Sequence, residues 1–563
     1  MVKLLETRKL EGILKYLIGI LLLILLNIIA SRHFTRLDLT EEGRYTIKPA
    51  TVELLTALDD NVYIDVYLEG DLNAGFKRLQ KAVQETLEEF EFYSDHKVIY
   101  RFVDPGLAMG QNARNEFMAN LAAKGITPTN VIDTRDGERI EKIIFPGAIV
   151  SYGGIERAVM LLSGMQGEEQ LNNSIEGVEY AIASTIYKLT RIERKRIGFI
   201  QGHDELDSLD ILSLQNALFE FYELEEIDLP QKNISPGIDL IIIAQPKQRF
   251  SEEDKYKIDQ FIMQGGKAVF MIDKLEANMD SASNEMNLAF PYQQNLDDML
   301  FRYGIRLNND LIQDNNAALY PIVIGYMGTQ PQVMQMPWPF FPLLNQFQEH
   351  PISRNLNMIL GRFVSTMDTV KADGVIKTPL LFTSNYSRSM GAPVKVSVND
   401  LRNNLKPQDF NSKLLPVAYL LEGTFQSVFK NRFLPKGANA SDLITQSQET
   451  KILVISDGDI ARNEINPTSG QPEDLGTVPW LQGIHFSNQE FLLNAIAYLT
   501  DENGIITARN KEVMVRPLDK VKISQQKLKW QIFNMVLPVA TILALGLILF
   551  LIRIKKNTKF ISE

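Results

Sequence analysis

IFNMVLPVATILALGLILFLI, residues 532–552, is an apolar run that only Asn534, Pro538, Thr541 and Gly546 interrupt. Roughly 20 apolar residues cross the hydrocarbon core of a bilayer as a helix. Trp530 precedes the run, and basic residues follow it, as is typical of a spanning helix anchored at both interfaces. The alternative, a buried core helix, is disfavoured because a basic segment follows at once. We therefore expect a transmembrane helix over residues 530–554.

A second apolar run, residues 13–30, predicts another membrane helix. A basic start and an apolar middle also mark cleaved signal peptides, but Ile28-Ile29-Ala30 is a poor cleavage site, so we expect an uncleaved anchor. Three Lys or Arg residues precede this run, a fourth, Lys15, lies at its start, and two follow it closely, which favours a cytoplasmic N-terminus. The sequence then predicts a bacterial inner-membrane protein with two spans and a periplasmic bulk, residues 31–529.

Composition limits the classes of function. The 563 residues are 45% hydrophobic and 23% charged, as in globular chains, and the length predicts three or four domains. A net charge of −11 argues against nucleic-acid binding, which needs a basic face. With no cysteine, the chain has no disulfide, thiol nucleophile or Cys-ligated metal. Gly265-Gly266-Lys267-Ala268 is not a P-loop and no GxGxxG occurs, so any ATP would be bound by another subunit.

Residues 31–165 alternate between strand and helix patterns. The expected strands are 62–68, 98–103, 130–133, 141–152 and 157–162, with helices at 76–93 and 115–124. This β-α-β-α-β-β order resembles a thioredoxin-like domain. Because the redox CxxC is absent, we expect an extracytoplasmic scaffold or docking surface here rather than a redox enzyme.

Residues 166–195 predict a bridging helix, and residues 196–500 predict a second α/β domain. Strands are expected at 196–201, 239–244, 267–272, 379–384, 416–422 and 451–456, with helices at 211–222, 251–264 and 488–499. Alternating strands and helices predict a doubly wound parallel sheet, with a large insertion at about 274–378. Residues 501–529 are expected to be a polar, partly extended linker.

The insertion contains an unusual apolar stretch, PIVIGYMGTQPQVMQMPWPFFPLL, residues 321–344. One interpretation is an irregular hairpin that packs on its own domain. The other is a partner-facing patch built on Trp338, Phe340 and Phe341.

Polar residues follow the predicted strands of the second domain. In a doubly wound sheet, ligands bind at the carboxyl ends of the strands, which here carry His203, Asp204, Glu205, Asp273, Asp457 and Asp459. A histidine with several carboxylates could bind a ligand or metal, or act as acid and base. The alternative is that these residues cap helices and shape loops. The other histidines form no HxH or HExxH spacing, so we expect no metal, no cofactor and no catalytic residue.

An ordered set of motifs carries a family resemblance. RLDLTEEGRYTIKPATVELL (36–55), VYIDVYLEGDL (62–72), YRFVDP (100–105) and FIQGHDE (199–205), between two apolar helices, resemble the GldG family of gliding-motility-associated ABC transporter auxiliary proteins. The resemblance implies a non-ATPase, membrane-anchored subunit that works with a permease and a separate ATPase. It also implies a class I glutamine-amidotransferase-like fold for the second domain, without the cysteine nucleophile of those enzymes.

Three hypotheses remain open from the sequence. The first is a structural and interaction subunit that caps or gates a transporter. The second is a tethered substrate-binding protein that uses the strand-end cleft for an envelope ligand. The third, ranked last, is a hydrolase of envelope sugar or peptide, disfavoured because no GxSxG motif occurs. In each case we expect Ala540 and Ala544, with Asn534, to pack the last helix against a partner helix.

Overall fold

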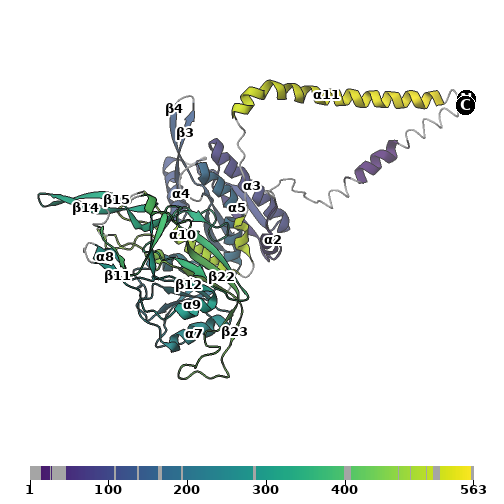
Figure 1. Ribbon diagram of the computed structural model, residues 1–563. Helices are drawn as coiled ribbons and strands as arrows, with labels where there is room; N and C mark the ends of the chain where they lie inside the picture. Colours follow the sequence, from purple (N-terminus) through teal and green to yellow (C-terminus); the bar gives the residue numbers. More distant parts are fainter. Residues whose placement is uncertain are drawn as a thin grey trace, which may run out of the picture. The chain divides into compact units, whose positions relative to one another are not determined.

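The computed structural model describes residues 14, 16–25, 27, 46–106, 110–135, 138–162, 168–191, 194–282, 287–398, 407–466, 468–481, 483–501, 504–510 and 520–559. The chain divides into two compact units, residues 1–512 and 513–563. The larger unit contains two main sheets and their covering helices, and the smaller contains one long helix, α11 (Figure 1).

The first sheet has the strand order β2-β1-β5-β6. β2 (Val98–Phe102) is parallel to β1 (Val62–Val66), β5 (Gly147–Tyr152) is antiparallel to β1, and β6 (Ile155–Met160) is antiparallel to β5. Val62, Ile64 and Val66 alternate along β1 and are buried in one core with side chains of α3 (Ala74–Tyr93) and α5 (Glu168–Thr190). These two helices therefore cover one face of the sheet.

Helical periodicity explains the position of α3. Apolar residues recur every three or four positions from Phe76 to Phe90 and form its buried face. Asn73 caps the helix because its side-chain oxygen accepts the backbone N–H groups of Gly75 and Phe76 at 3.0 Å. On the opposite face of the sheet, Leu121 of α4 (Gln111–Ala123) packs with a separate buried cluster. The short α2 (Pro49–Thr56) joins the α3 side.

The expected single strand at 141–152 is wrong. The structure divides it into β4 (Glu138–Ile144), which forms a hairpin with β3 (Thr129–Arg135), and β5 of the main sheet. The break falls at Phe145-Pro146, where proline lacks the N–H that a continuous ladder requires. The expected turn at Gly153-Gly154 is confirmed, since both glycines have positive φ between β5 and β6.

The second sheet has eight strands in the order β16-β19-β22-β23-β10-β9-β7-β8. β7 (Arg196–Gln201), β8 (Glu223–Asp228), β9 (Leu240–Ala244), β10 (Lys267–Met271) and β23 (Gln446–Ile455) are mutually parallel. β22 (Pro416–Gln426), β19 (Val375–Phe382) and β16 (Gln346–Phe347) extend the sheet in antiparallel pairs. The expected all-parallel sheet is thus wrong for this side, where the sheet is mixed.

Two cores sandwich this second sheet. Side chains on one face of β9 and β10 pack with α6 (Leu212–Phe219) and α10 (Asn488–Thr500). Those on the other face pack with α7 (Glu252–Met263) and α9 (Asp297–Tyr303). Strand β8 was not expected because its sequence, ELEEID, is highly charged, which an edge strand tolerates.

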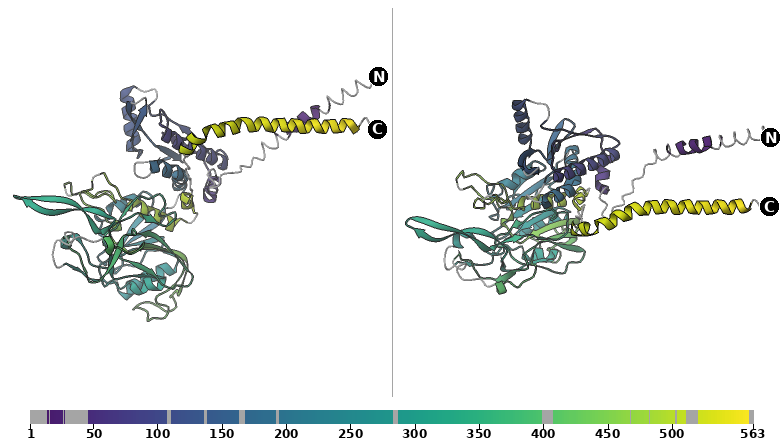
Figure 2. Two further views of the ribbon diagram at one scale, coloured as in Figure 1. Left: turned by 45° about the horizontal axis from the view of Figure 1, so that its top comes forward. Right: turned by 90° about the horizontal axis from the view of Figure 1, so that it is seen from above.

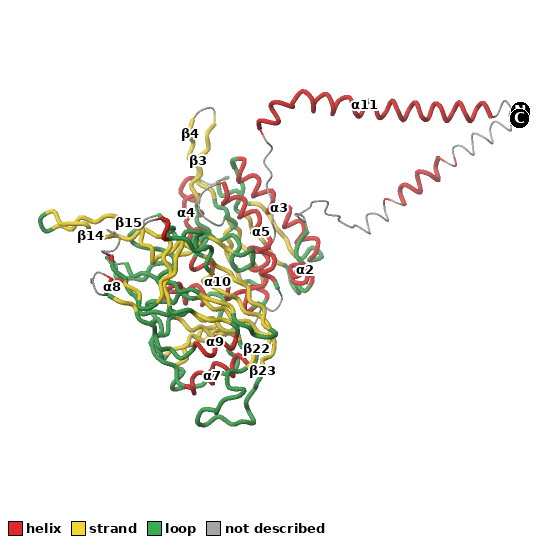
Figure 3. Tube along the Cα trace, in the orientation of Figure 1, coloured by secondary structure: helices red, strands yellow, loops and turns green. Residues whose placement is uncertain are grey.

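The region between β10 and β22 contains short paired strands joined by loops (Figure 3). The pairs are β11 (Leu288–Ala289) with β21 (Val394–Lys395), β12 (Ile305–Leu307) with β18 (Met367–Thr369), and β13 (Asp310–Asp314) with β20 (Ser387–Gly391). β14 (Ala317–Met327) and β15 (Gln330–Leu344) form a ribbon that projects from the unit, and the end of β15 pairs with β17 (Ile359–Leu360) (Figures 1 and 2). This region also contains the short helices α8 (Met279–Ala282) and η2 (Pro407–Asp409), and η3 (Asp459–Ala461) follows β23.

The expected extended linker at 501–529 is partly wrong. Residues 505–510 form the 3₁₀ helix η4 (Ile505–Asn510), and Ile505 is buried in the core of the first sheet. Residues 520–529 already belong to α11 (Lys520–Lys559), and 511–519 lie outside the described residues.

One helix among the described residues is long and apolar enough to cross a membrane: Gln525–Ile552, within α11. Its side chains are exposed, as a lipid-facing surface would be. In the expected N-terminal span, the structure describes a shorter apolar helix, Tyr16–Leu25, and the remainder of 13–30 falls largely outside the described residues.

Candidate functional site

Parallel pairing brings together three of the residues expected at the strand ends. β10 and β23 are adjacent and parallel, so Asp273, which follows β10, lies beside Asp457 and Asp459, which follow β23. One carboxylate oxygen from each of these three residues lies within 4.8 Å of the others. We call Asp273, Asp457 and Asp459 the carboxylate cluster.

Hydrogen bonds hold Asp273 and Asp459 in place. The Asp273 carboxylate accepts the Gly458 backbone N–H at 2.5 Å and the Gln245 amide at 2.6 Å. The same Gln245 amide donates to Asp459 at 2.9 Å, and Arg462 Nε donates to Asp459 at 2.6 Å. Gly458 permits this close approach, since a Cβ there would lie 2.6 Å from Gln245 Cγ.

Only one carboxylate oxygen of Asp457 has a hydrogen-bond donor among the described residues. Its Oδ2 accepts the backbone N–H of Arg362 at 2.9 Å, whereas its buried Oδ1 has no hydrogen-bond partner among the described residues. The side chain is 1% exposed, so water does not solvate this oxygen freely. A proton on Oδ1 would allow it to donate to a neighbouring carboxylate, which would remove the unsatisfied acceptor.

Electrostatics favour such a proton. Burial and the charges of Asp273 and Asp459 raise the pKa of Asp457 well above its ordinary value. Burial, followed by repulsion from Asp459, raises the pKa of Asp273 to about 7, although the Gly458 and Gln245 hydrogen bonds oppose the shift. The cluster therefore retains protons that exposed carboxyl groups would lose.

Two chemical capacities follow from this arrangement. The cluster can hold a shared proton, and its oxygens form a donor set suited to a hard cation such as Mg²⁺ or Ca²⁺. Arg462 already supplies positive charge, bonding to Asp459 and, at 2.9 Å, to Asp210. With Asp273 4% and Asp457 1% exposed, the cluster is an internal site and does not line an open cleft.

His203 belongs to a separate buried arrangement. Its Nδ1 lies 3.3 Å from Glu205, its Nε2 lies 3.4 Å from Asp254, and its ring stacks on Phe250 with centroids 3.6 Å apart. Glu205 also accepts the His203 backbone N–H at 2.7 Å. Asp204 is exposed and has a positive φ of 60°. These contacts match the structural role that the sequence left open for this loop.

The expected partner-interface residues differ in burial: those of the insertion are buried, and those of α11 are exposed. Trp338, Phe340 and Phe341 are buried, at 1%, 3% and 3% exposure, in a core of the insertion, so the self-packing hairpin describes them and a partner-facing patch does not. The exposed apolar side chains of the ribbon lie farther along it, as at Tyr326. In α11, Asn534, Ala540 and Ala544 are exposed.

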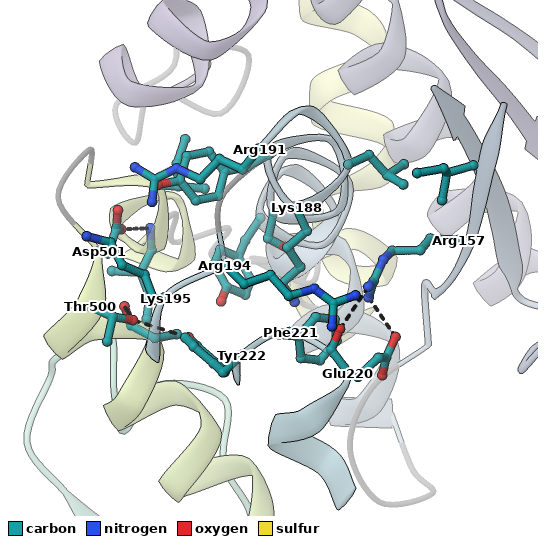
Figure 4. Close-up of a pocket in the computed structure, with 18 residues that line it drawn as sticks. Arg157, Lys188, Arg191, Arg194, Lys195, Glu220, Phe221, Tyr222, Thr500 and Asp501 are labelled. Carbon is teal, nitrogen blue, oxygen red and sulfur yellow. Dashed lines mark hydrogen bonds and ion pairs between the residues drawn. The ribbon is translucent and has the colours of Figure 1, made fainter. Parts of the chain in front are cut away.

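Sequence reasoning missed Gln245, Arg462 and Asp254. Gln245 follows β9, and the rule applied to the other strand ends would have found it. Arg462 and Asp254 lie within or near helical segments and carry no such signal. The sequence reasoning also missed a cavity of about 490 Å³, lined by basic and apolar side chains around α5 (Figure 4).

Comparison with known proteins identifies the family. Residues 194–495, more than half of the chain, match the family described as "ABC-type uncharacterized transport system". The chain belongs to this family. Membership in this ABC-type transport family indicates an auxiliary, transport-associated protein that associates with ABC transporter components. Residues 41–151 match a second family, described as a domain of unknown function.

Similarity to individual proteins adds little. A Borreliella burgdorferi protein described as uncharacterized is 25% identical over 425 residues, which cover 74% of this chain and 77% of that protein. The solved structure "mmIFT52 N-terminal domain" is 14% identical and covers 55% of this chain and 99% of its own, with a TM-score of 0.31. That score is too low to support a structural argument.

Proposed function

We propose that this protein is a non-ATPase, membrane-anchored subunit of an ABC-type transporter complex, with a structural or gating role and no enzymatic activity. One combined observation carries the proposal: a chain of the ABC-type transport family also contains a 28-residue candidate membrane span. The sequence has no P-loop, so a separate subunit would supply ATPase activity and a permease would supply the translocation path.

The proposed architecture is a thioredoxin-like domain over 31–165 and an amidotransferase-like domain over 196–500, joined by residues 166–195. The order β2-β1-β5-β6, with α3 and α4 after the first two strands, supports the first. Five parallel strands with helices on both faces support the second. A tethered binding protein with a strand-end cleft is less favoured because the carboxylate cluster is buried.

Affinity purification tests the proposed assembly. The full chain, tagged and extracted from membranes in mild detergent, should recover an ABC permease and an ABC ATPase identifiable by mass spectrometry. Recovery of neither protein, from membranes that contain both, would contradict the subunit role.

The last helix offers a sharper test of the same proposal. Ala540 and Ala544 lie four residues apart on α11, where small side chains allow close approach of a second helix. Replacing both with leucine should reduce permease recovery several-fold, whereas Val539→Leu, which places a leucine on a neighbouring face of the same helix, should leave it unchanged. Equal recovery with both variants would refute helix packing at this pair.

We also propose two spans, with both termini cytoplasmic and a periplasmic bulk, at the bacterial inner membrane. The excess of basic residues before residue 13 supports this topology. An impermeant label should reach a probe placed at the exposed Asn278 from outside the inner membrane. Labelling of this position only after the membrane is opened would exclude a periplasmic bulk.

The link to gliding motility rests on the GldG-like motifs of the sequence. Deletion of the gene should abolish colony spreading in a gliding source organism, and restoration of the chain should recover it. Normal spreading without the protein would remove this part of the proposal.

A further inference from the structure

A cavity of about 490 Å³ lies beside the C-terminal half of α5, within the larger unit. Its walls come from α5, β6, the segment before β7, residues 220–222 after α6, the end of α10 with Asp501, and the first two residues of η4. Ligand cavities commonly have volumes of about 300–1,000 Å³, so this one is large enough for a small organic molecule. Figure 4 shows the lining side chains.

Basic residues dominate the charged lining of the cavity. Five basic side chains line it, against two acidic ones among the described residues, Glu220 and Asp501. The basic residues are Arg157, Lys188, Arg191, Arg194 and Lys195. The chain as a whole is acidic, with a net charge of −11. The cavity is therefore a local region of positive potential that favours an anion.

Three of these cations lack a carboxylate partner. Arg157 pairs with Glu220 at 2.7 Å, and Lys195 pairs with Asp239 at 3.0 Å. Among the described residues, no carboxylate lies within 4.0 Å of Lys188, Arg191 or Arg194. An anion in the cavity would supply the missing counter-charge.

Two of the cations contact the same aromatic ring. Lys188 Nζ lies 3.7 Å from the centroid of the Phe221 ring, and the Arg157 guanidinium carbon lies 4.7 Å from the same centroid. In Figure 4 the Arg194 side chain extends toward the same end of the cavity. Three cations from β6, α5 and the segment before β7 thus face one region, and each can donate to a shared group of oxygen atoms.

The rest of the lining is largely apolar. Ile155, Leu189, Ile505 and Ile506 contribute aliphatic surface next to the aromatic side chains of Phe221 and Tyr222. Such a lining buries a hydrocarbon or aromatic body, while the few charged groups fix its orientation. The cavity therefore suits a molecule with an apolar body and an anionic end.

The electrostatic state of Lys188 is consistent with an anionic ligand. Although Lys188 is an exposed residue, the protein atoms around its ammonium remove water, which lowers its pKa to about 8. The neighbouring Arg157 lowers the pKa further, and Glu220 opposes the shift. A bound anion near this ammonium would favour its charged form.

We propose that this cavity binds a phosphate ester with an apolar body, held at its phosphate by Lys188, Arg194 and Arg157 and at its body by the apolar lining. Phosphate is favoured over carboxylate because a doubly charged group matches an excess of several cations. The proposal is independent of the transporter role. The phosphate ester could be a lipid headgroup with its chains or a water-soluble phosphate.

Titration calorimetry on the full chain in phosphatidylcholine nanodiscs tests the site. Hexyl phosphate should bind to one site per chain, and inorganic phosphate and 1-hexanol should each bind at least tenfold more weakly. Affinity for inorganic phosphate equal to that for hexyl phosphate would overturn the role of the apolar lining. Dihexanoyl phosphatidic acid that binds tighter than hexyl phosphate would support a lipid source, and weaker binding would support a soluble one.

Matched variants locate the binding. Lys188→Gln and Arg194→Gln should each weaken hexyl phosphate binding at least fivefold, and the double variant more. Lys371→Gln removes a lysine that is 88% exposed and remote in sequence from the cavity lining, and it should leave the affinity unchanged. Since Arg194 is exposed and lies outside any helix or strand, its variant should fold normally even if Lys188→Gln, within α5, does not. Unchanged affinity in a folded Arg194→Gln variant, or no binding by the wild-type chain, would refute the proposal.

Discussion

Replacement of Asp457 by asparagine should stabilise the second α/β domain at alkaline pH. The change preserves size, and the new amide oxygen can still accept the Arg362 N–H that Asp457 accepts at 2.9 Å. The amide nitrogen replaces the unpartnered Oδ1 with a donor for Asp273 or Asp459. A buried repulsion thus becomes a hydrogen bond.

Burial and the charges of Asp273 and Asp459 raise the pKa of Asp457 well above its ordinary value, and the neighbouring Asp273 gives the scale of such a shift in this cluster. In the folded protein the pKa of Asp273 is raised to about 7, whereas an unfolded aspartate titrates at about 3.9, its ordinary value. The folded state therefore binds the proton more tightly, and the free energy of unfolding falls as pH rises from about 4 to 7. About three pKa units correspond to at most about 4 kcal/mol. Because Asp459 remains as a source of repulsion, we expect Asp457→Asn to recover about 1–3 kcal/mol at pH 8 and little at pH 4.

Thermal unfolding followed by tryptophan fluorescence provides the assay, since Trp338 and Trp480 both lie in this domain. For a large domain, about 1 kcal/mol shifts Tm by about 2–4 °C, so a rise of at least about 2 °C is expected at pH 8. The rise should diminish as the pH falls, because protonated Asp457 and asparagine then present similar groups.

Asp259→Asn is the matched control. This buried carboxylate accepts the Tyr303 hydroxyl at 2.8 Å, the Ser427 hydroxyl at 2.7 Å and the Val428 N–H at 3.0 Å. An amide nitrogen cannot accept these bonds, so the variant should be destabilised by about 1–3 kcal/mol at pH 8. If Asp457→Asn lowered Tm at pH 8 as much as Asp259→Asn, the interpretation of a repulsive, proton-holding cluster would be refuted.

Two further predictions concern stability. His203→Ala should lower Tm by several degrees, because it removes the stacking on Phe250 and leaves buried carboxylates without the imidazole, yet the recovery of transporter partners by the folded protein should not change. Trp338→Ala should destabilise the domain by about 3–5 kcal/mol through loss of a buried ring, whereas Tyr326→Ser, at a position 73% exposed on the same ribbon, should change the denaturation midpoint little. Equal effects of the two ribbon variants would contradict the division into a buried base and an exposed outer part.

Local patterns in the sequence determined much of the secondary structure. The helical spacing of Leu79, Val83 and Leu87 predicts α3, and the apolar run at 532–552 predicts the helix that the structure shows as α11. Such features depend on neighbours a few residues away, so a single sequence contains them.

The sequence failed where distant pairing decides the outcome. The segment ELEEID forms strand β8 because it pairs with the edge of β7. β22 is antiparallel to β23 because the chain reverses between them, so that Gln426 at the end of β22 pairs with Gln446 at the start of β23. Local periodicity predicts neither the formation of β8 nor the direction of β22. The apolar residues at 338–341 gave no indication of whether they face inward, since burial depends on what packs over them.

The strand-end residues show the same division. The sequence placed Asp273 and Asp457 after strands, and adjacency of parallel β10 and β23 then brought their carboxylates together. Only the tertiary structure showed that His203 turns to Phe250 and Asp254 instead, and that Gln245 and Arg462 complete the cluster. The sequence did not predict the basic cavity either, because its lining residues come from segments up to about 350 positions apart. Residue type is fixed by the sequence, but the pKa, burial and partners of each group depend on what the fold places within a few ångströms of it.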